Sequence, residues 1–204
     1  VKNKAKPGLL IKKYDEDTGM PLEKAEFSVK KKDGSIVYEG MTDKSGQIKI
    51  ENLEPDWYTI TELAPPKGYL IATESKEVKL EPNKVTEIKF DNRLRPALQI
   101  MKIDSQTGKA LKGAVFKVVK TEDSTESEYT TDDTGTILLQ DLDEAIYTVT
   151  EVKAPDGYLL DEQHKDIQLE WGKTKTLVFE NKARPALEIL KIDEATKKPL
   201  AGAK

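Results

Sequence analysis

Short runs of alternating apolar and polar residues follow one another along the chain, and turn-forming residues separate them. In residues 57–63, for example, Tyr58 and Ile60 alternate with Thr59 and Thr61. This period of two residues is typical of a β-strand with one buried face. The runs predict strands at 8–14, 25–30, 35–39, 47–51, 57–63, 75–80 and 85–91. Because no stretch shows a sustained helical period, the pattern predicts a compact antiparallel β-sandwich.

The same pattern returns after a constant interval. Residues 97–104 recur at 186–193, an offset of 89 residues, and residues 58–62 recur at 147–151 with the same offset and no gap. Self-similarity at a fixed period indicates tandem modules.

The repeat also sets the expected boundaries. We expect two complete modules at 7–94 and 95–183, preceded by the last strand of a truncated module at 1–6 and followed by the first strand of another at 184–204. The sequence is then a piece of a longer array. Proline stiffens each joint, at Pro96 and Pro185, so we expect an elongated rod.

Composition narrows the class of protein. Hydrophobic residues make up 37% of the 204 residues and charged residues 34%, which suits small modules with heavily charged surfaces. The net charge is −4 with both signs interleaved, which disfavours nucleic acid as a partner. No apolar run predicts a membrane span or a signal peptide. Cysteine is absent, so disulfides and thiolate zinc sites are excluded.

Three polar residues lie on the apolar faces of three different strands in each module. Strand side chains alternate between faces, which places Lys13, Glu62 and Asn92 among apolar residues of the first module. The second module repeats them as Lys102, Glu151 and Asn181. The neighbouring Lys12 is replaced by Met101 in the repeat, whereas Lys13 is matched by Lys102. Lys13 is therefore the lysine that the repeat keeps.

Three interpretations of this pattern are open. Each residue could end a strand, with the lysine reaching solvent, the glutamate bonding a loop and the asparagine starting a turn. The three could form a buried hydrogen-bonded network. They could also react, because unpaired burial is costly and the coincidence recurs in both modules at the same phase.

The reaction that these residue types allow is amide formation. Burial disfavours charge, so the lysine can be a neutral amine and the glutamate a neutral acid. The amine can attack the asparagine carbonyl carbon while Glu62, or Glu151, shuttles protons and ammonia leaves. The products are isopeptide bonds, Lys13–Asn92 and Lys102–Asn181. Each bond forms once, so the protein is not expected to be an enzyme.

These residues carry a family resemblance. Lys13-x-Asp15, the stretch from Tyr58 through Glu62 to a Pro-x-Gly-Tyr ending at Tyr69, and the terminal Phe-x-Asn resemble Cna B-type (SpaA-like) repeat domains. Such domains occur in Gram-positive cell-wall-anchored adhesins and pilins. The resemblance implies tandem transthyretin-like, inverse-immunoglobulin all-β sandwiches with self-formed isopeptide bonds. Asn3 and Lys191 match the motif, but their modules lack the glutamate, so we assign them no reaction.

The expected function follows from the bond and the resemblance together. The first and last strands would be joined covalently, which predicts a stalk that spaces an adhesive region from the cell wall, outside the cell. Neighbouring repeats are the expected partners, and a host extracellular matrix protein bound through another region stays open. The alternatives are a ligand-binding adhesin module and a sortase-polymerised pilus shaft subunit.

Weaker signals predict no further site. The acidic stretches at 15–17 and 132–133 lack the ligand spacing of a calcium loop and are typical of turns. His164 has no counterpart in the first module and is interpreted as a surface residue. We therefore predict neither a metal site nor a cofactor.

Overall fold

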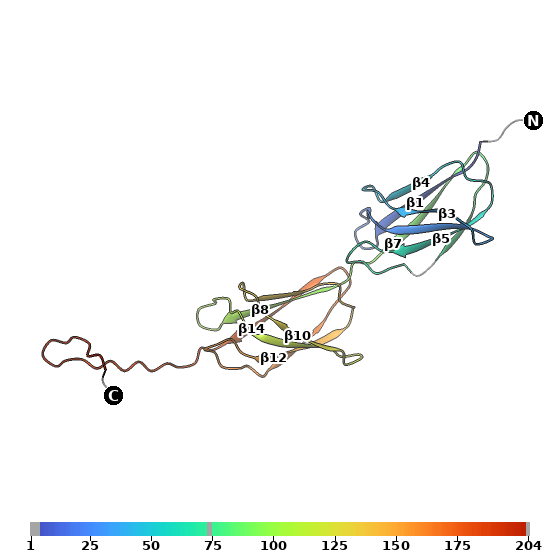
Figure 1. Cartoon of the computed structure of the whole chain (residues 1–204). Helices are drawn as coiled ribbons and strands as arrows, with labels where there is room; N and C mark the ends of the chain where they lie inside the picture. Colours follow the sequence, from blue (N-terminus) through green and yellow to red (C-terminus); the bar gives the residue numbers. More distant parts are fainter. Residues whose placement is uncertain (1–4, 73–74, 203–204) are drawn as a thin grey trace, which may run out of the picture.

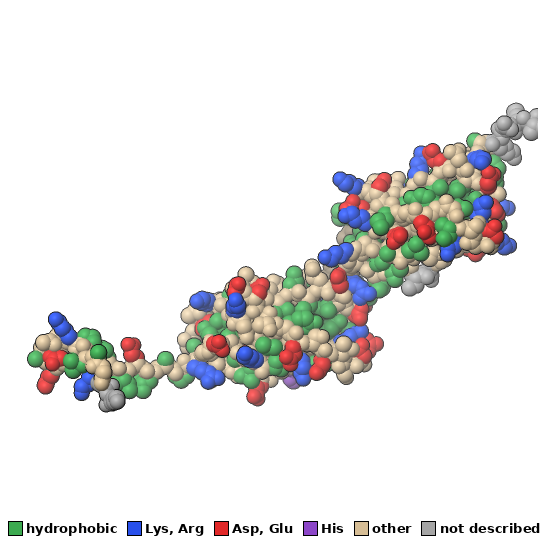
Figure 2. Space-filling model, viewed as in Figure 1, with side chains coloured by type: hydrophobic (Ala, Val, Ile, Leu, Met, Phe, Trp, Pro, Cys, Tyr) green, Lys and Arg blue, Asp and Glu red, His purple; other side chains and the backbone are tan. Residues whose placement is uncertain are grey.

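The computed structural model describes residues 5–72 and 75–202, and these form two β-sandwiches placed end to end (Figure 1). No helix occurs in this part of the chain, and accordingly none that could span a membrane. Figure 2 shows acidic and basic side chains interspersed over the visible face of both modules, as the interleaved charges of the sequence predict. The all-β sandwich class expected from the sequence is confirmed.

The first module contains seven strands in two sheets. They are β1 (Gly8–Asp15), β2 (Glu26–Lys31), β3 (Ile36–Met41), β4 (Gln47–Ile50), β5 (Trp57–Ala64), β6 (Lys76–Lys79) and β7 (Val85–Asn92). One sheet has the order β4-β1-β7 and the other β3-β2-β5-β6. Each strand lies within two residues of its predicted position, because alternation is a local signal.

The second module repeats this arrangement strand for strand. Its strands are β8 (Ala97–Asp104), β9 (Val115–Lys120), β10 (Glu126–Thr130), β11 (Thr136–Leu139), β12 (Ile146–Lys153), β13 (His164–Gln168) and β14 (Thr174–Asn181). The sheets have the orders β11-β8-β14 and β10-β9-β12-β13. Each module has its own core, built around the ring pairs Phe27–Phe90 and Phe116–Phe179.

One pairing differs from the antiparallel sandwich that the alternation predicts. The first and last strands of each module, β1 with β7 and β8 with β14, run parallel. A parallel pair needs a long crossover, and the intervening strands supply it. Because these two strands point the same way, the chain enters a module at one end and leaves it at the other.

The segment expected to be the first strand of a following module differs from that expectation. Residues 184–202 contain no strand, and Leu187 and Ile189 are 85% and 84% exposed. The turn after it nevertheless forms, with a bridge between Ile192 and Pro199 that matches the Tyr14–Pro21 bridge of the first module. The turn is local in sequence, whereas a strand needs the partners that β4 and β7 provide for β1. Residues 1–4, with Asn3, lie outside the described residues.

The joint between the modules is tied to both of them. On the side of the first module, Arg95 N donates to Gly68 O at 2.8 Å and Leu70 N donates to Arg93 O at 2.9 Å. On the side of the second, Gly172 N donates to Leu94 O at 2.8 Å and Leu142 N to Pro96 O at 3.1 Å. The backbone groups of the joint thus alternate between the two modules.

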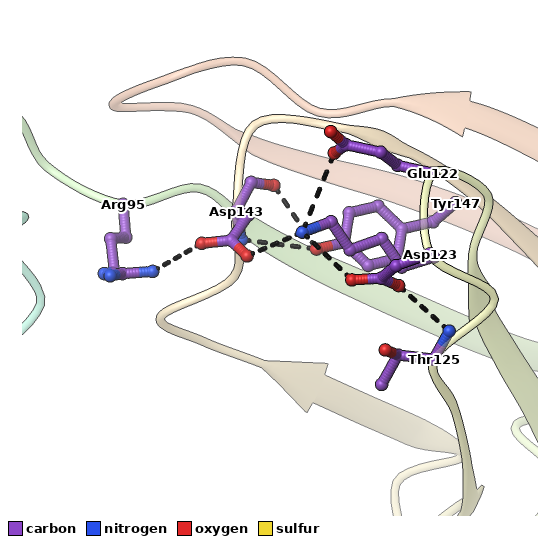
Figure 3. Close-up of polar contacts among 7 residues, drawn as sticks. Arg95, Glu122, Asp123, Thr125, Asp143 and Tyr147 are labelled. Carbon is purple, nitrogen blue, oxygen red and sulfur yellow. Dashed lines mark hydrogen bonds and ion pairs between the residues drawn. The ribbon is translucent and has the colours of Figure 1, made fainter.

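Side chains reinforce this joint. Figure 3 shows Arg95 directed at Asp143, with a distance of 2.7 Å between Arg95 Nη1 and Asp143 Oδ1. Lys120 Nζ lies 2.9 Å from the other oxygen of Asp143. Hydrogen bonds from Lys120 and Arg95 hold the pKa of Asp143 below its usual value. The first module has an equivalent pair, Lys6 Nζ to Glu54 Oε1 at 2.5 Å, so this ion pair is part of the repeat.

Candidate functional site

The first module encloses a lysine, a glutamate and an asparagine in mutual contact. Lys13 on β1, Glu62 on β5 and Asn92 on β7 are 0%, 3% and 2% exposed. Lys13 Nζ lies 3.2 Å from Glu62 Oε2 and also donates to Asn92 Oδ1. Asn92 Nδ2 donates to Glu62 Oε1 at 2.8 Å. The glutamate therefore bridges the amine and the amide nitrogen.

The second module brings together the corresponding residues. Lys102 Nζ lies 3.2 Å from Glu151 Oε2, and Asn181 Nδ2 donates to Glu151 Oε1 at 2.9 Å. All three are at most 2% exposed. Asn181 Oδ1 is buried without a hydrogen-bond partner among the described residues. The oxygen of this amide is thus able to accept a further hydrogen bond.

Burial changes the protonation of the two lysines. Desolvation is the largest effect at Lys13 and lowers its pKa, and the opposing attraction of Glu62 is smaller. Desolvation likewise lowers the pKa of Lys102 against the attraction of Glu151. The rings of Phe27 and Phe90 lie 5.8 and 5.9 Å from Lys13 Nζ, so the amine is surrounded largely by apolar groups. This environment favours the neutral, nucleophilic form of lysine.

The strand register places the amine beside the amide. Lys13 pairs with Phe90 and Asp15 with Asn92 in the parallel β1–β7 ladder, so residues of like phase point inward together. Glu16 N donates to Asn92 O at 2.9 Å and ends the ladder there. Gly46 lies against the other edge of β1 with φ of 69°, where a Cβ would come within 2.5 Å of Lys13 O. A side chain at position 46 would therefore force the backbone at Lys13 or the turn itself to shift.

A second contact, which sequence reasoning missed, supports the glutamate. Tyr69 Oη donates to Asp15 Oδ2 at 2.9 Å, and three residues later Ala72 N donates to Glu62 Oε2 at 2.8 Å. Desolvation and the hydrogen bond to Asp15 raise the pKa of Tyr69 to about 12, so its hydroxyl remains a donor. The loop from Tyr69 to Ala72, which holds the glutamate, is thus anchored to Asp15, two residues after Lys13.

The second module makes the same two contacts. Tyr158 Oη donates to Asp104 Oδ2 at 2.9 Å, and Asp161 N donates to Glu151 Oε2 at 3.1 Å. The recurrence of Lys-x-Asp and Pro-x-Gly-Tyr at a constant offset is the sequence signal that could have revealed this pairing.

The acidic stretches act as turns. Asp15 Oδ1 accepts hydrogen bonds from the backbone of Asp17 and Thr18, and Asp132 Oδ1 accepts from Thr134 and Thr136. Within the described residues no group of three acidic or histidine side chains could hold a metal ion. His164 is exposed at the start of β13.

Comparisons with known proteins agree with this fold. A family model described as SpaA, prealbumin-like fold domain, matches residues 7–94 and 96–183. Among curated proteins the comparison finds no match.

A solved shaft pilin shows the same fold at low identity, and two further structures are reported as similar. The shaft pilin SpaA from Lactobacillus rhamnosus GG is 16% identical, with 89% of this chain and 99% of that chain covered and a TM-score of 0.56. A streptococcal ancillary pilin is 24% identical, with 91% and 64% covered and a TM-score of 0.46. The Bacillus anthracis TIE protein is 23% identical, with 89% of this chain but 34% of that protein covered and a TM-score of 0.46. Together, the sandwich topology and two family matches that span most of the sequence establish that this chain belongs to the SpaA prealbumin-like fold domain family.

Proposed function

We propose that the chain forms stalk modules of a Gram-positive surface protein, each closed by an isopeptide bond between its first and last strands. The bonds join Lys13 to Asn92 and Lys102 to Asn181, with Glu62 and Glu151 as catalytic proton shuttles. The observation that carries the proposal is the burial of all three groups in both modules, at the same places in the fold, with the glutamate in contact with both the lysine and the asparagine. Pilins among the structures of similar fold agree with a surface role.

The reaction balances without any other reactant. Lys13 Nζ forms a bond to Asn92 Cγ, and the bond from Cγ to Nδ2 breaks. The proton that Nζ loses passes through Glu62, which lies within hydrogen-bonding reach of both nitrogens, to Nδ2, which leaves as ammonia. Folding holds the amine against the carbonyl, so proximity supplies most of the rate acceleration. The reaction runs once in each module.

The proposed bond would change how a module carries mechanical tension. Tension on a tandem array enters a module through β1 and leaves through β7, and the proposed bond joins these two strands 79 residues apart. Force then passes through the covalent bond instead of the hydrogen bonds of the ladder. Such modules suit an inextensible extracellular spacer whose partners are the neighbouring repeats. The same property would serve a sortase-polymerised pilus shaft.

The intact mass of the chain tests the chemistry. Each bond releases one ammonia, about 17 Da, so the complete reaction gives a deficit of about 34 Da. Glu62→Ala should lose the first bond and retain the second, because the two cores are separate. Glu151→Ala is the matched variant for the other module. A mass equal to that of the unmodified sequence would contradict the covalent proposal.

A surface of the first module favours a second candidate function, the ligand-binding module. Lys30, Lys32, Trp57 and Thr59 line a hollow of ≈ 700 Å³ on the outer face of β2 and β5, with Lys31 as a third lysine and Glu77 as its one carboxylate, and Trp57 is 47% exposed. The second module has Val119, Thr121, Ile146 and Thr148 at these positions. An exposed indole beside lysines suits an acidic polysaccharide, whose sugar rings stack on the indole and whose anionic groups attract the ammonium groups.

Binding to heparin tests this candidate. The full chain should bind heparin at low ionic strength, and Trp57→Ala combined with Lys32→Ala should weaken binding, whereas Ile146→Ala should leave it unchanged. Equal binding by all variants, or none by the parent chain, would reject the surface as a polysaccharide site. Either result leaves the mass test unaffected.

A further inference from the structure

A second lysine lies beside the buried residues in both modules. Lys76, at the start of β6, donates from Nζ to Lys89 O on β7 at 2.6 Å, and its Nζ lies 4.8 Å from the centre of the Phe90 ring. Its counterpart Lys165 donates to Val178 O at 2.6 Å and lies 4.7 Å from the Phe179 ring. The two lysines are 89 residues apart, as the repeat requires.

This lysine connects the two sheets where they are open. β6 is the last strand of one sheet and β7 the last strand of the other, and backbone pairing does not join them. The hydrogen bond from Lys76 to the β7 backbone spans this gap one residue before Phe90 and three before Asn92. The same two contacts occur in both modules.

The Phe90 ring lies near both this lysine and the amine of the proposed cross-link. Its ring centre lies 4.8 Å from Lys76 Nζ and 5.9 Å from Lys13 Nζ. The exposed cation and the buried amine therefore share one aromatic ring as a neighbour. Phe179 stands in the same relation to Lys165 and Lys102, at 4.7 and 5.8 Å.

The charged groups facing each buried amine come from three strands or their adjoining loops. For Lys13, desolvation is the largest influence and lowers its pKa, Glu62 on β5 and Asp91 on β7 raise it, and Lys76 on β6 lowers it. For Lys102, Glu151 and Asp161 raise the pKa and Lys165 lowers it; Asp161 stands at the repeat position of Ala72, not of Asp91. Lys76 and Lys165 thus oppose the two carboxyl groups in setting the charge of the amine.

We propose that Lys76 and Lys165 are positioning residues for isopeptide formation, which hold the two sheet edges together beside the reacting pair and keep a positive charge near the amine. This inference rests on the proposed function. It assigns the exposed lysine two effects, one on geometry and one on the fraction of neutral amine. Neither requires the lysine to touch the reacting atoms.

The test follows bond formation during refolding. Unreacted chain is extracted from inclusion bodies in urea and refolded by dilution at pH 5 to 9. The reaction is stopped with acid at successive times, and the protein is digested. Mass spectrometry of the peptides then gives the fraction of each module that carries the bond. With Trp171 replaced by Phe in every variant, Trp57 fluorescence reports whether the first module has refolded. Lys76→Met keeps the apolar stem on Phe90 but removes the charge and the donor, and Lys76→Arg retains both.

The Met variant should slow bond formation in the first module severalfold near pH 6 while the second module reacts as before. The difference should shrink as the pH rises, because loss of a neighbouring cation raises the pKa of Lys13 and less amine is neutral at low pH. Lys76→Arg should restore the parent profile, and Lys165→Met should move the defect to the second module.

Two results are decisive against parts of this scheme. A refolded Lys76→Met chain whose first module reacts at the parent rate at every pH overturns the role of Lys76 and leaves the isopeptide proposal intact. A parent chain that refolds without any loss of mass overturns the isopeptide proposal itself, and the positioning role with it.

Discussion

The buried lysine is the residue on which the proposed chemistry of each module depends. An unpaired buried charge costs several kcal/mol, and even a paired one gives back little of its desolvation cost. Lys13 is fully buried, and burial lowers its pKa. Conversion of the amine to an amide would remove this ionisable group from the core. The proposed reaction therefore relieves a penalty that folding creates, which is one reason for it to proceed once the module has folded.

The titration of Lys13 leads to a pH prediction for a module that cannot react. In Asn92→Ala the lysine remains an amine with a pKa below the ordinary 10.5. Between the folded pKa and 10.5 the unfolded chain binds more protons than the folded one, so the free energy of unfolding should rise with pH in this window. Urea unfolding, followed by Trp57 with Trp171 replaced by Phe, measures it. Lys13→Met in the same background should remove most of the dependence.

The Tyr69 hydroxyl should matter for both stability and reaction. Tyr69→Phe removes the hydrogen bond to Asp15, a loss of about 1 kcal/mol in the free energy of unfolding, measured in the Asn92→Ala background by urea unfolding. With Asn92 present, bond formation should also slow, because the loop that presents Ala72 N to Glu62 loses its anchor. Tyr158→Phe should affect the second module alone. Unchanged bond formation in both variants would show that the loop is held by other contacts.

At the scale of elements, each module has a buried threonine whose hydroxyl bonds to two backbone groups of the loop before the second strand. Thr42, directly after β3, donates to Leu22 O at 2.7 Å and accepts from Ala25 N at 3.0 Å. Thr131 does the same with Leu111 O and Ala114 N, at 2.9 and 3.0 Å. These bonds attach the entry of β2, or β9, to the end of its neighbouring strand. They satisfy backbone groups that no strand pairing reaches.

Thr42→Val should therefore lower the free energy of unfolding of the first module by about 1 to 3 kcal/mol, since two buried backbone groups lose their partner. Thr42→Ser, which keeps the hydroxyl, should cost less. Urea unfolding in the Asn92→Ala background gives the values, and Thr131→Val serves as the matched change in the other module. If Val and Ser behave alike, the hydroxyl is not the stabilising group.

At the scale of the whole molecule, two modules with parallel first and last strands lie end to end through a joint bonded to both (Figure 1). Every module then receives force along the same two strands. The structure connects the position of the proposed bond with the direction of the load, because β1 and β7 carry both the reacting groups and the chain that continues to the neighbours.

Single-molecule pulling should show this directly. With both bonds formed, the parent chain should lengthen without the unfolding step of either module. Lys13→Ala should release the chain between the bonded positions, which are 79 residues apart, an extension of about 260 Å at about 3.3 Å per residue. Lys102→Ala should give a step of the same size. A step of this length from the parent chain, at forces ordinary for β-sandwiches, would contradict the stalk proposal.

The sequence by itself determined those features whose signal is local or repeated. Alternation located the strands to within two residues, the offset of 89 residues separated Lys13 from Lys12, and the spacing of three motifs indicated the family that the comparisons confirm. The structure agrees with the distinction between the lysines, because Lys12 points outward to Glu87 at 2.7 Å. The chemical roles of the buried residues stay predictions until the mass is measured.

Only the tertiary structure decided which distant segments meet. The parallel pairing of β1 with β7, the contact of Tyr69 with Asp15 and the bridge from Lys76 to β7 join positions 13 to 77 residues apart in sequence. Residues 184–202 show what happens without such partners, since they repeat the sequence of β1 and its turn, yet only the turn forms. A turn is stabilised by its own neighbours, whereas a strand and a buried site exist only where other strands supply hydrogen bonds and exclude water.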